Sequence, residues 1–183
     1  RLAEVGLSDC VVIMGLGLMG QLASQMAVSA GCRVIAYDPD AERCQVAAAV
    51  EGVQAVSDAA MLGSLVSART GGIGADAVII TASTSSSEPI AMAAEVSRDR
   101  GRVVMLGATG MDVPRRPFFE KELTFLVSRS YGPGRYDPLY EEGGADYPPG
   151  FVKWTEGRNM EAVLDLMARR GVDLGGFEPS VLS

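Results

Sequence analysis

Short apolar runs alternate along this chain with longer segments whose apolar positions recur every three to four residues. Residues 10–14 form a run rich in valine and isoleucine that ends at a glycine, which is typical of a strand buried on both faces. Over residues 18–30 the apolar spacing is helical, and Gly31 follows as a C-terminal stop. The pattern therefore predicts a strand, a helix and a second strand at residues 33–37.

The same alternation continues through the middle of the chain. Asp40 is placed to cap a helix over residues 41–49, and Pro89 suits the first turn of another helix that starts at Ser87 and runs to residue 96. Because strands separated by helices of this length need crossover connections, we expect a doubly wound α/β fold with parallel strands and helices on both faces. The other predicted elements are a weak strand at 54–56, a helix at 61–69, and strands at 77–81, 102–106 and 123–127.

The pattern changes after Ser130. Residues 131–158 show no clear periodicity, and we expect them to form a long ordered loop or lid. Regularity returns over residues 159–170, where one face is apolar, so we expect an amphipathic helix that packs back on the sheet. That face consists of Met160, Val163, Leu164 and Met167.

The composition indicates one globular domain, or one domain with an extension. At 183 residues, 48% hydrophobic and 21% charged, the chain can bury a sizeable core. A net charge of −7 and a pI near 4.6 disfavour nucleic acid and anionic membranes as partners, because both attract basic surfaces. No apolar run approaches the roughly 20 residues of a bilayer span and no basic-then-apolar leader is present, so we expect a cytoplasmic protein.

Histidine is absent, which removes both the commonest metal ligand and the commonest general base. We therefore expect no catalytic residue and no metal site in this chain. Cys10, Cys32 and Cys44 lie in or beside apolar runs without C-x-x-C spacing, so we expect buried, reduced thiols. The chain begins at Arg1 without methionine and close to its first strand, and we expect it to be part of a longer protein.

A G-x-G-x-x-G motif joins the first predicted strand to the first predicted helix. Such a motif is weak alone, but here an acidic residue, Asp38, follows about 20 residues later at the end of the next strand. The glycines allow a tight turn, approach of a pyrophosphate and close helix packing, and the helix N-terminus offers an anion site. The motif residues are Gly15, Leu16, Gly17, Leu18, Met19 and Gly20.

Asp38 would accept hydrogen bonds from ribose hydroxyls and repel a 2′-phosphate, which predicts NAD(H) rather than NADP(H) as the cofactor. The alternative is a glycine-rich helix start in which Asp38 only caps a turn. Ligands of doubly wound sheets lie outside the carboxyl ends of the strands, which adds further contact candidates. These are Thr81, Ala82, Ser83, Thr84, Gly107, Ala108 and Thr109.

Two other polar runs have competing interpretations. The hydroxyl-rich residues 83–87 either contact the cofactor or form a solvated loop with a helix cap. For Glu120, Lys121 and Glu122 we expect a solvated charged face.

With these residues in place, the chain resembles the cofactor domain of the medium-chain dehydrogenase/reductase family, the zinc-type alcohol dehydrogenases and their relatives. The resemblance spans most of the chain and rests on VVIM before GLGLMG, on VIAYDPDAER, GADAVI and GRVVMLG, and on a final amphipathic helix before Gly-Val-Asp-Leu. Residues 128–138 further resemble a bacterial subgroup in which such a domain is fused to a second oxidoreductase module, often linked to sugar metabolism.

Carried over by position, the resemblance implies that the three glycines hold the pyrophosphate, Asp38 the ribose, and that Arg43 lies near the adenine. It implies that Gly107 and Ala108 neighbour the nicotinamide, and that Ser128 and Ser130 bind its carboxamide. In this family the substrate site and any zinc ligands come from a separate catalytic domain, which is absent here. The segment 131–154 departs from the family's usual short connection, and residues 176–183 do not match the segment that the family has at this point.

We therefore expect residues 1–130 to form a dinucleotide-binding domain, 131–158 a loop or lid, and 159–183 a C-terminal helix and tail of the same domain. The expected function is hydride transfer to or from an alcohol or carbonyl substrate of the sugar type, completed by the missing catalytic domain. The alternatives are an NAD-sensing regulatory module without redox catalysis and a scaffold that has lost its ligand. Exposed edge strands in such sheets also allow a homodimer.

Overall fold

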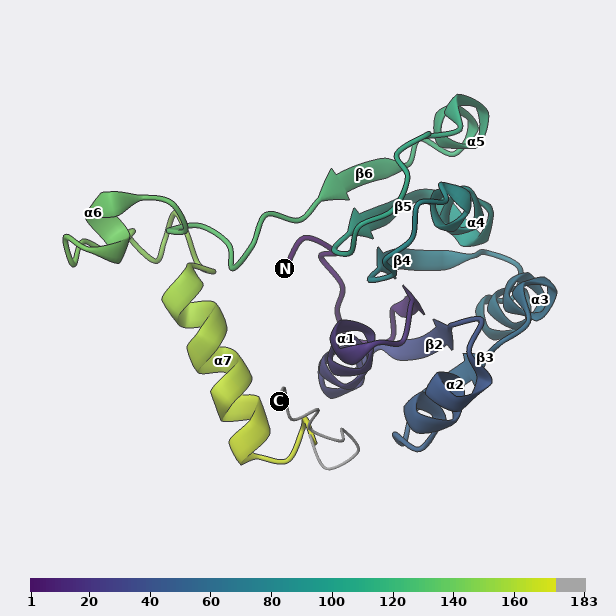
Figure 1. Ribbon diagram of the computed structural model, residues 1–183, viewed down its shortest axis with the longest axis horizontal. Coiled ribbons are helices and arrows are strands. Elements are labelled where there is room, and N and C mark those ends of the chain that lie inside the picture. Colours follow the sequence, from purple (N-terminus) through teal and green to yellow (C-terminus); the bar gives the residue numbers. More distant parts are fainter. Residues whose placement is uncertain (174–183) are drawn as a thin grey trace.

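Six parallel strands form the centre of the computed structural model, which describes residues 1–173 (Figure 1). The strand order is β3-β2-β1-β4-β5-β6, which confirms the predicted doubly wound α/β fold. The expectation for residues 176–183 falls outside the described residues. The strands are β1 (Cys10–Met14), β2 (Arg33–Tyr37), β3 (Val53–Val56), β4 (Ala75–Ile80), β5 (Ser97–Met105) and β6 (Thr124–Val127).

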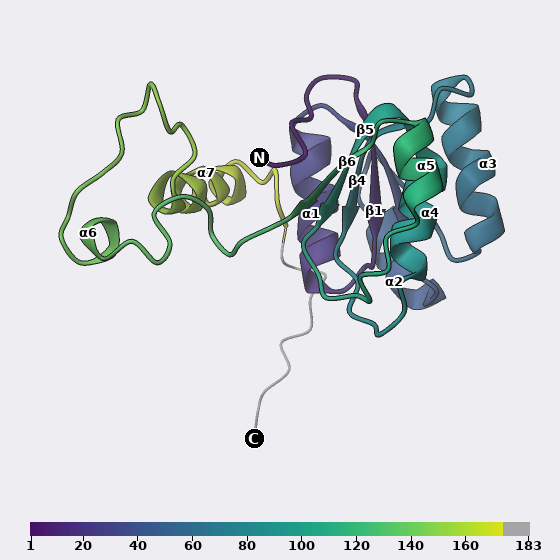
Figure 2. The same cartoon turned by 90° about the horizontal axis from the view of Figure 1, so that it is seen from above.

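Helices cover both faces of this sheet. Figure 2 shows α1 on one face and α3, α4 and α5 on the other. The short helices α5 and α6 were not expected, and the remaining helices lie within a few residues of their predicted positions. The helices are α1 (Leu18–Ser29), α2 (Ala41–Ala48), α3 (Ala59–Thr70), α4 (Glu88–Val96), α5 (Arg115–Glu120), α6 (Pro138–Glu141) and α7 (Glu156–Ala168).

Local signals explain where these helices start and stop. The Asp40 carboxylate accepts hydrogen bonds from the backbone N–H groups of Glu42 and Arg43, which confirms the predicted cap of α2. Gly31 takes a positive φ of 83° directly after α1, a conformation that glycine adopts without steric cost. Asp40 thus starts α2 after β2, and Gly31 turns the chain from α1 toward β2.

The core lies on both sides of β1, whose residues are all buried. Val11 and Ile13 pack with residues of α1 and α2, whereas Val12 and Met14 pack with residues of α3 and α4. The three cysteines are buried as predicted, and burial raises the pKa of each thiol, so that they stay protonated near neutral pH. A strand that is apolar on both faces thus fixes the position of the glycine turn that follows it.

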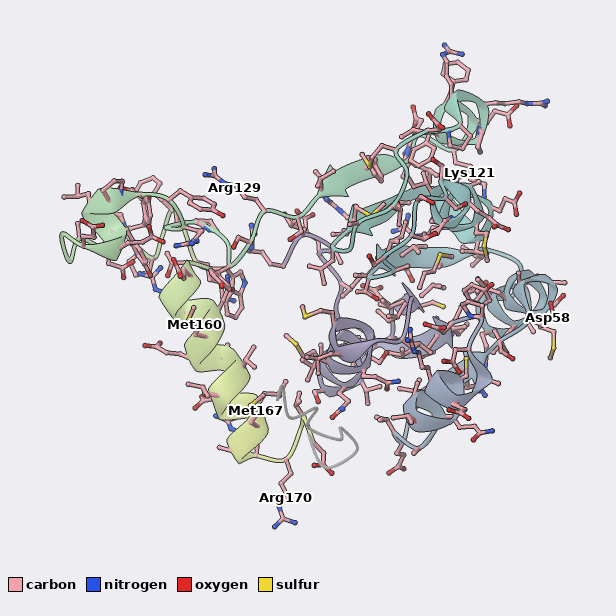
Figure 3. All side chains as sticks on the ribbon, viewed as in Figure 1. Asp58, Lys121, Arg129, Met160, Met167 and Arg170 are labelled. Atoms are coloured by element: carbon pink, nitrogen blue, oxygen red, sulfur yellow. The ribbon has the colours of Figure 1, made fainter. Side chains whose placement is uncertain are left out.

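Residues 131–170 form an arm that projects away from the sheet (Figures 1 and 2). The expectation that its helix α7 packs on the sheet is wrong, because none of the residues of α7 is buried. Figure 3 locates Met160 and Met167 along this helix, apart from the sheet. The N-terminal segment covers part of the sheet face instead, where Ala3 packs with Ala77 and Val104.

Both ends of the arm connect to the part of the protein that contains the sheet. Its start continues from β6, and its far end returns to α1, where the Gln25 side-chain amide exchanges two hydrogen bonds with the backbone of Asp173, of 3.0 and 2.6 Å. The Ser29 hydroxyl donates to the carbonyl of Gly171 at 2.7 Å beside them. Within residues 1–173, no helix combines the length and the apolar character needed to cross a membrane.

Candidate cofactor-binding site

A cavity of about 490 Å³ opens at the carboxyl ends of β1, β2 and β4. This is where the connections of the sheet diverge, since β1 lies between β2 on one side and β4 on the other. Ligands of doubly wound sheets bind at this point of the topology. The lining residues are Met14, Gly15, Gly17, Tyr37, Asp38, Pro39, Arg43, Thr81, Ala82, Ser83, Thr84, Ser86, Glu88, Pro89 and Met92.

Gly15 and Gly17 of the glycine motif line this cavity, and each glycine of the motif is required for a different steric reason. Gly15 has a positive φ of 94°, and its N–H donates to the carbonyl of Tyr37 at 2.8 Å. A Cβ on Gly20 would lie 1.8 Å from the Gly15 carbonyl oxygen, so only glycine lets α1 approach the turn this closely. A Cβ on Gly17 would meet no atom within 4 Å, which leaves room for a ligand against the backbone.

The carboxylate of Asp38 lies directly beside this turn and is 4% exposed. One oxygen accepts the backbone N–H of Leu16 at 2.6 Å, and the other accepts that of Asp40 at 2.9 Å. The Arg43 guanidinium lies 3.7 Å away and also pairs with Asp40 at 3.4 Å. An ionised carboxylate has about four acceptor sites, so Asp38 retains the capacity to accept ribose hydroxyls.

The first helical turn of α1 supplies backbone N–H donors next to the glycine turn. Gly17 is the N-cap residue, and no side chain among the described residues caps this helix. Leu18 and Met19 are exposed, whereas Leu16 is buried. The N–H groups at the start of a helix, together with its dipole, favour an anion at this position.

The loop after β4 forms the facing wall. The Thr81 hydroxyl lies 2.5 Å from the Gly15 carbonyl oxygen and donates to it, which ties β4 to the glycine turn. The Ser86 hydroxyl accepts the N–H of Glu88 at 3.0 Å, and the Ser87 hydroxyl accepts that of Asp112 at 3.0 Å. The hydroxyl-rich run therefore organises the start of α4, while Ser83, Thr84 and Ser86 also line the cavity.

The residues predicted for the nicotinamide end lie beside the cavity rather than in its lining. The Ala108 N–H donates to the carbonyl of Ala82 at 3.0 Å, and a Cβ on Gly107 would lie 2.1 Å from that carbonyl oxygen. Ser128 follows β6 and donates its N–H to Met105 at 2.8 Å, and Ser130 is exposed with φ of 42°. Of the predicted set, the cavity brings together Gly15, Gly17, Asp38, Arg43, Thr81, Ala82, Ser83 and Thr84, and it also includes Ser86 of the hydroxyl-rich run.

Sequence reasoning missed several lining residues, notably Tyr37 and Glu88. Burial, followed by the negative charges of Glu88 and Asp38, raises the pKa of the Tyr37 phenol above its ordinary value. Both residues had a positional signal, because one ends β2 and the other starts α4 at the same edge of the sheet. The other missed residues are Met14, Pro39, Pro89 and Met92.

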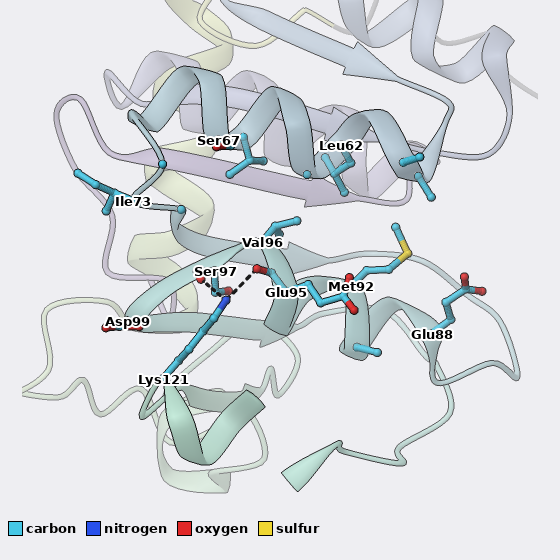
Figure 4. A pocket seen from close by; sticks show the side chains of 17 residues that line it. Leu62, Ser67, Ile73, Glu88, Met92, Glu95, Val96, Ser97, Asp99 and Lys121 are labelled. Atoms are coloured by element: carbon cyan, nitrogen blue, oxygen red, sulfur yellow. Dashed lines mark hydrogen bonds between the residues drawn. The ribbon is translucent and has the colours of Figure 1, made fainter. Parts of the chain in front are cut away.

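A larger cavity, about 710 Å³, lies between α3 and α4 (Figure 4). It contains no residue of the glycine turn, so the smaller cavity at the strand ends is the one that contains the predicted site residues. The Lys121 ammonium donates to the carbonyls of Ala94, Glu95 and Ser97, each at 2.8 Å. The expectation that Lys121 belongs to a solvated face is therefore wrong, because this side chain caps the end of α4.

The sequence of this chain is similar to those of known dehydrogenases. "Putative alcohol dehydrogenase D" of Mycobacterium tuberculosis is 37% identical over 100 residues, which cover 54% of this chain and 27% of that protein. The 2-dehydro-3-deoxy-L-galactonate 5-dehydrogenase of Pseudoalteromonas atlantica is 30% identical over 155 residues, or 81% of this chain and 45% of that protein. The chain thus spans less than half the length of these relatives.

Solved structures share the fold. Galactitol-1-phosphate dehydrogenase from Escherichia coli superposes with a TM-score of 0.71 and 20% identity, covering 95% of this chain and 46% of that one. The sequence profile of the zinc-binding dehydrogenases matches residues 19–143, which is more than half of the chain. The chain therefore belongs to the zinc-binding dehydrogenase family, as its resemblance to the medium-chain dehydrogenases/reductases predicted.

Proposed function

We propose that this chain holds NAD(H) for an oxidoreductase that transfers a hydride between the nicotinamide and an alcohol or carbonyl substrate. The substrate pocket and the acid or base that moves the hydroxyl proton come from a catalytic domain outside this chain. Among residues 1–173, no group of three or more histidine, cysteine, aspartate or glutamate side chains is arranged to hold a metal ion. By itself the chain would bind the cofactor without turnover.

The residues at the strand ends fit a dinucleotide. The open side of Gly17 leaves space for a pyrophosphate beside the first amides of α1, and the 490 Å³ cavity extends from there to Asp38. The proposal rests most on the buried carboxylate of Asp38, which lies one strand away from the glycine turn and marks the ribose position. A 2′-phosphate there would meet a buried negative charge, which favours NAD(H).

These positions suggest separate roles for the cofactor and for the residues of this chain. NADH would supply the hydride to a carbonyl substrate or NAD⁺ would accept it from an alcohol, and the residues of this chain would orient the cofactor. The amides at the start of α1 hold the pyrophosphate, Asp38 accepts the ribose hydroxyls, and Arg43 lies at the adenosine end. Gly107, Ala108, Ser128 and Ser130 remain predictions for the nicotinamide end. For the substrate, the relative named for 2-dehydro-3-deoxy-L-galactonate supports a sugar-type alcohol.

Titration calorimetry with NADH and NADPH tests the proposal. We expect NADH to bind in the micromolar range and NADPH at least about tenfold more weakly, because about 1.4 kcal/mol of charge repulsion gives a factor of ten. In Asp38→Asn the difference between the two cofactors should fall below about threefold, since the repelling charge is gone.

Asp40→Asn is the matched control. Asp40 lies two residues away and caps α2, and asparagine caps helices about as well as aspartate, so the preference for NADH should persist. Equal affinities of the unmodified chain for NADH and NADPH would contradict the role given to Asp38. Binding of neither cofactor would contradict the proposed function.

A further inference from the structure

Gln21 is a buried polar residue that directly follows the glycine motif. It lies in the first turn of α1 and is 4% exposed. Its side-chain amide nitrogen donates to the carbonyl of Leu16 at 3.2 Å and to the carbonyl of Arg43 at 3.0 Å. Both N–H groups of the amide are thus used, and each reaches a different segment of the chain.

The two carbonyls belong to the two segments that the cofactor has to contact together. Leu16 is in the glycine turn, and Arg43 is in the first turn of α2, shortly after Asp38. A second link joins the same segments, because the Leu16 N–H donates to the Asp38 carboxylate at 2.6 Å. Both backbone polar groups of Leu16 are therefore tied to the segment 38–43, one through Asp38 and one through Gln21.

We propose that Gln21 is a positioning residue that sets the spacing between the glycine turn and the segment 38–43. This inference rests on the proposed function, because the spacing matters only to a ligand that occupies both segments at once. A dinucleotide places its pyrophosphate at one segment and its adenosine ribose at the other. When the two half-sites are held at the correct separation, the second contact costs little further ordering.

Loss of the link has a specific consequence. The glycine turn and the start of α2 would each keep their own contacts, so a ligand that occupies only one segment would bind as before. The Leu16–Asp38 hydrogen bond would then hold the two segments without the second link, so a ligand that spans both would have to order part of their separation when it binds, and its affinity would fall. A buried amide that served stability alone would not distinguish between these two kinds of ligand.

Gln21→Met tests this, because methionine has a similar shape and no donor. Gln25→Met is the matched control, since Gln25 lies one turn later on α1, is 7% exposed and hydrogen-bonds the backbone of Asp173 instead. We would measure dissociation constants of NADH, ADP-ribose and adenosine by displacement of NADH fluorescence. We expect Gln21→Met to weaken NADH and ADP-ribose about tenfold and adenosine less than twofold, with all three ligands within twofold in Gln25→Met.

Equal weakening of adenosine and ADP-ribose would overturn the proposal, as would unchanged NADH affinity or the same loss in Gln25→Met. Gln21→Leu, which also lacks donors and adds no charge beside the pyrophosphate site, should reproduce the selective loss if the methionine variant folds poorly.

Amide hydrogen exchange of the cofactor-free chain supplies a second measurement. Residues 15–18 and 42–44 should exchange faster in Gln21→Met than in the unmodified chain or in Gln25→Met, and unchanged exchange would overturn the link. Failure of the unmodified chain to bind NADH would refute the proposed function, and the exchange data would still decide whether Gln21 couples the two segments.

Discussion

The sheet and the arm of this protein are built by different interactions. The sheet and its flanking helices place side chains such as Val12 and Ile90 in a core from which water is excluded. The arm relies mainly on polar and aromatic contacts: Arg158 pairs with Asp146, and the rings of Tyr140 and Tyr147 stack with their centroids 5.7 Å apart. None of the residues of α6 or α7, both within the described range, is buried.

The two regions also differ in what they contribute to the candidate cofactor cavity. Every residue that lines the candidate cofactor cavity lies between Met14 and Met92, in β1, β2, α2, α4 and the loops that follow the strands. The arm contributes no residue to that lining among those described, and it presents exposed apolar side chains such as Phe151 and Leu164. A cofactor site that must hold its geometry is thus placed where burial fixes the backbone, and not where ion pairs do.

The largest expected effect is the loss of stability when a large apolar side chain is truncated in the core rather than in the arm. Ile90 in α4 is fully buried, so Ile90→Ala should lower the free energy of unfolding by about 2–5 kcal/mol through lost burial and the cavity left behind. Leu164 in α7 is 64% exposed, and Leu164→Ala should change that free energy by less than about 0.5 kcal/mol. Urea denaturation followed by circular dichroism measures both, and a large loss in Leu164→Ala would show that the arm is packed in solution.

Helix glycines provide the next contrast. A Cβ on Gly20 would overlap the Gly15 backbone carbonyl, and Gly20→Ala should destabilise the protein by about 1–3 kcal/mol despite the better helix propensity of alanine. In the arm, a Cβ on Gly157 would lie 3.0 Å from the Tyr140 hydroxyl, at the end of a movable side chain. Gly157→Ala should therefore be neutral or stabilising by up to about 1 kcal/mol. Melting temperatures of the two variants that move in the same direction would contradict this assignment.

Removing a charged side chain should also lower the stability more near the sheet than in the arm, by a smaller amount. Lys121 caps α4 through three carbonyls, and Lys121→Met should cost about 1–2 kcal/mol because hydrogen bonds from a charged donor are lost. Arg169 pairs with Asp165 on the exposed surface of the arm, and Arg169→Met should change stability by less than about 0.5 kcal/mol. Chemical denaturation of both variants compares them, and equal effects would remove the distinction.

The order of strands and helices could be predicted from the sequence because most strands contain a short apolar run and most long helices have an apolar face, although the polar first half of β5, residues 97–101, gave no such signal. The position of α7 could not, because periodicity identifies an apolar face without identifying its partner. Residues such as Met160 and Leu164 form the stripe expected of a helix on a sheet, yet both are exposed. The N-terminal segment at Ala3, which covers part of the sheet instead, has no periodicity of its own to reveal this.

The candidate site shows the same limit. The glycines and Asp38 were predictable because steric and charge requirements restrict the residue type at those positions. Gln21 and Lys121 were not, because a glutamine or a lysine in a helix is ordinarily solvated, and their roles depend on carbonyls brought close by the fold. Positions that depend on local backbone geometry can be predicted from sequence, whereas positions that depend on a distant acceptor require the structure.

The smallest expected effect concerns a single proton in the arm. The Tyr147 hydroxyl donates to the Asp137 carboxylate, and this hydrogen bond holds the pKa of Asp137 below its ordinary value of 3.8. A carboxyl with a lowered pKa stabilises the folded arm above its ordinary pKa, and this stabilisation is lost as the pH falls through the lowered value. Tyr147→Phe should raise the pKa of Asp137 toward 3.8, as measured by NMR titration of the carboxyl carbon, and should leave the affinity for NADH unchanged. An unchanged pKa of Asp137 would mean that this contact does not persist in solution, and altered NADH binding would mean that the arm communicates with the cofactor site.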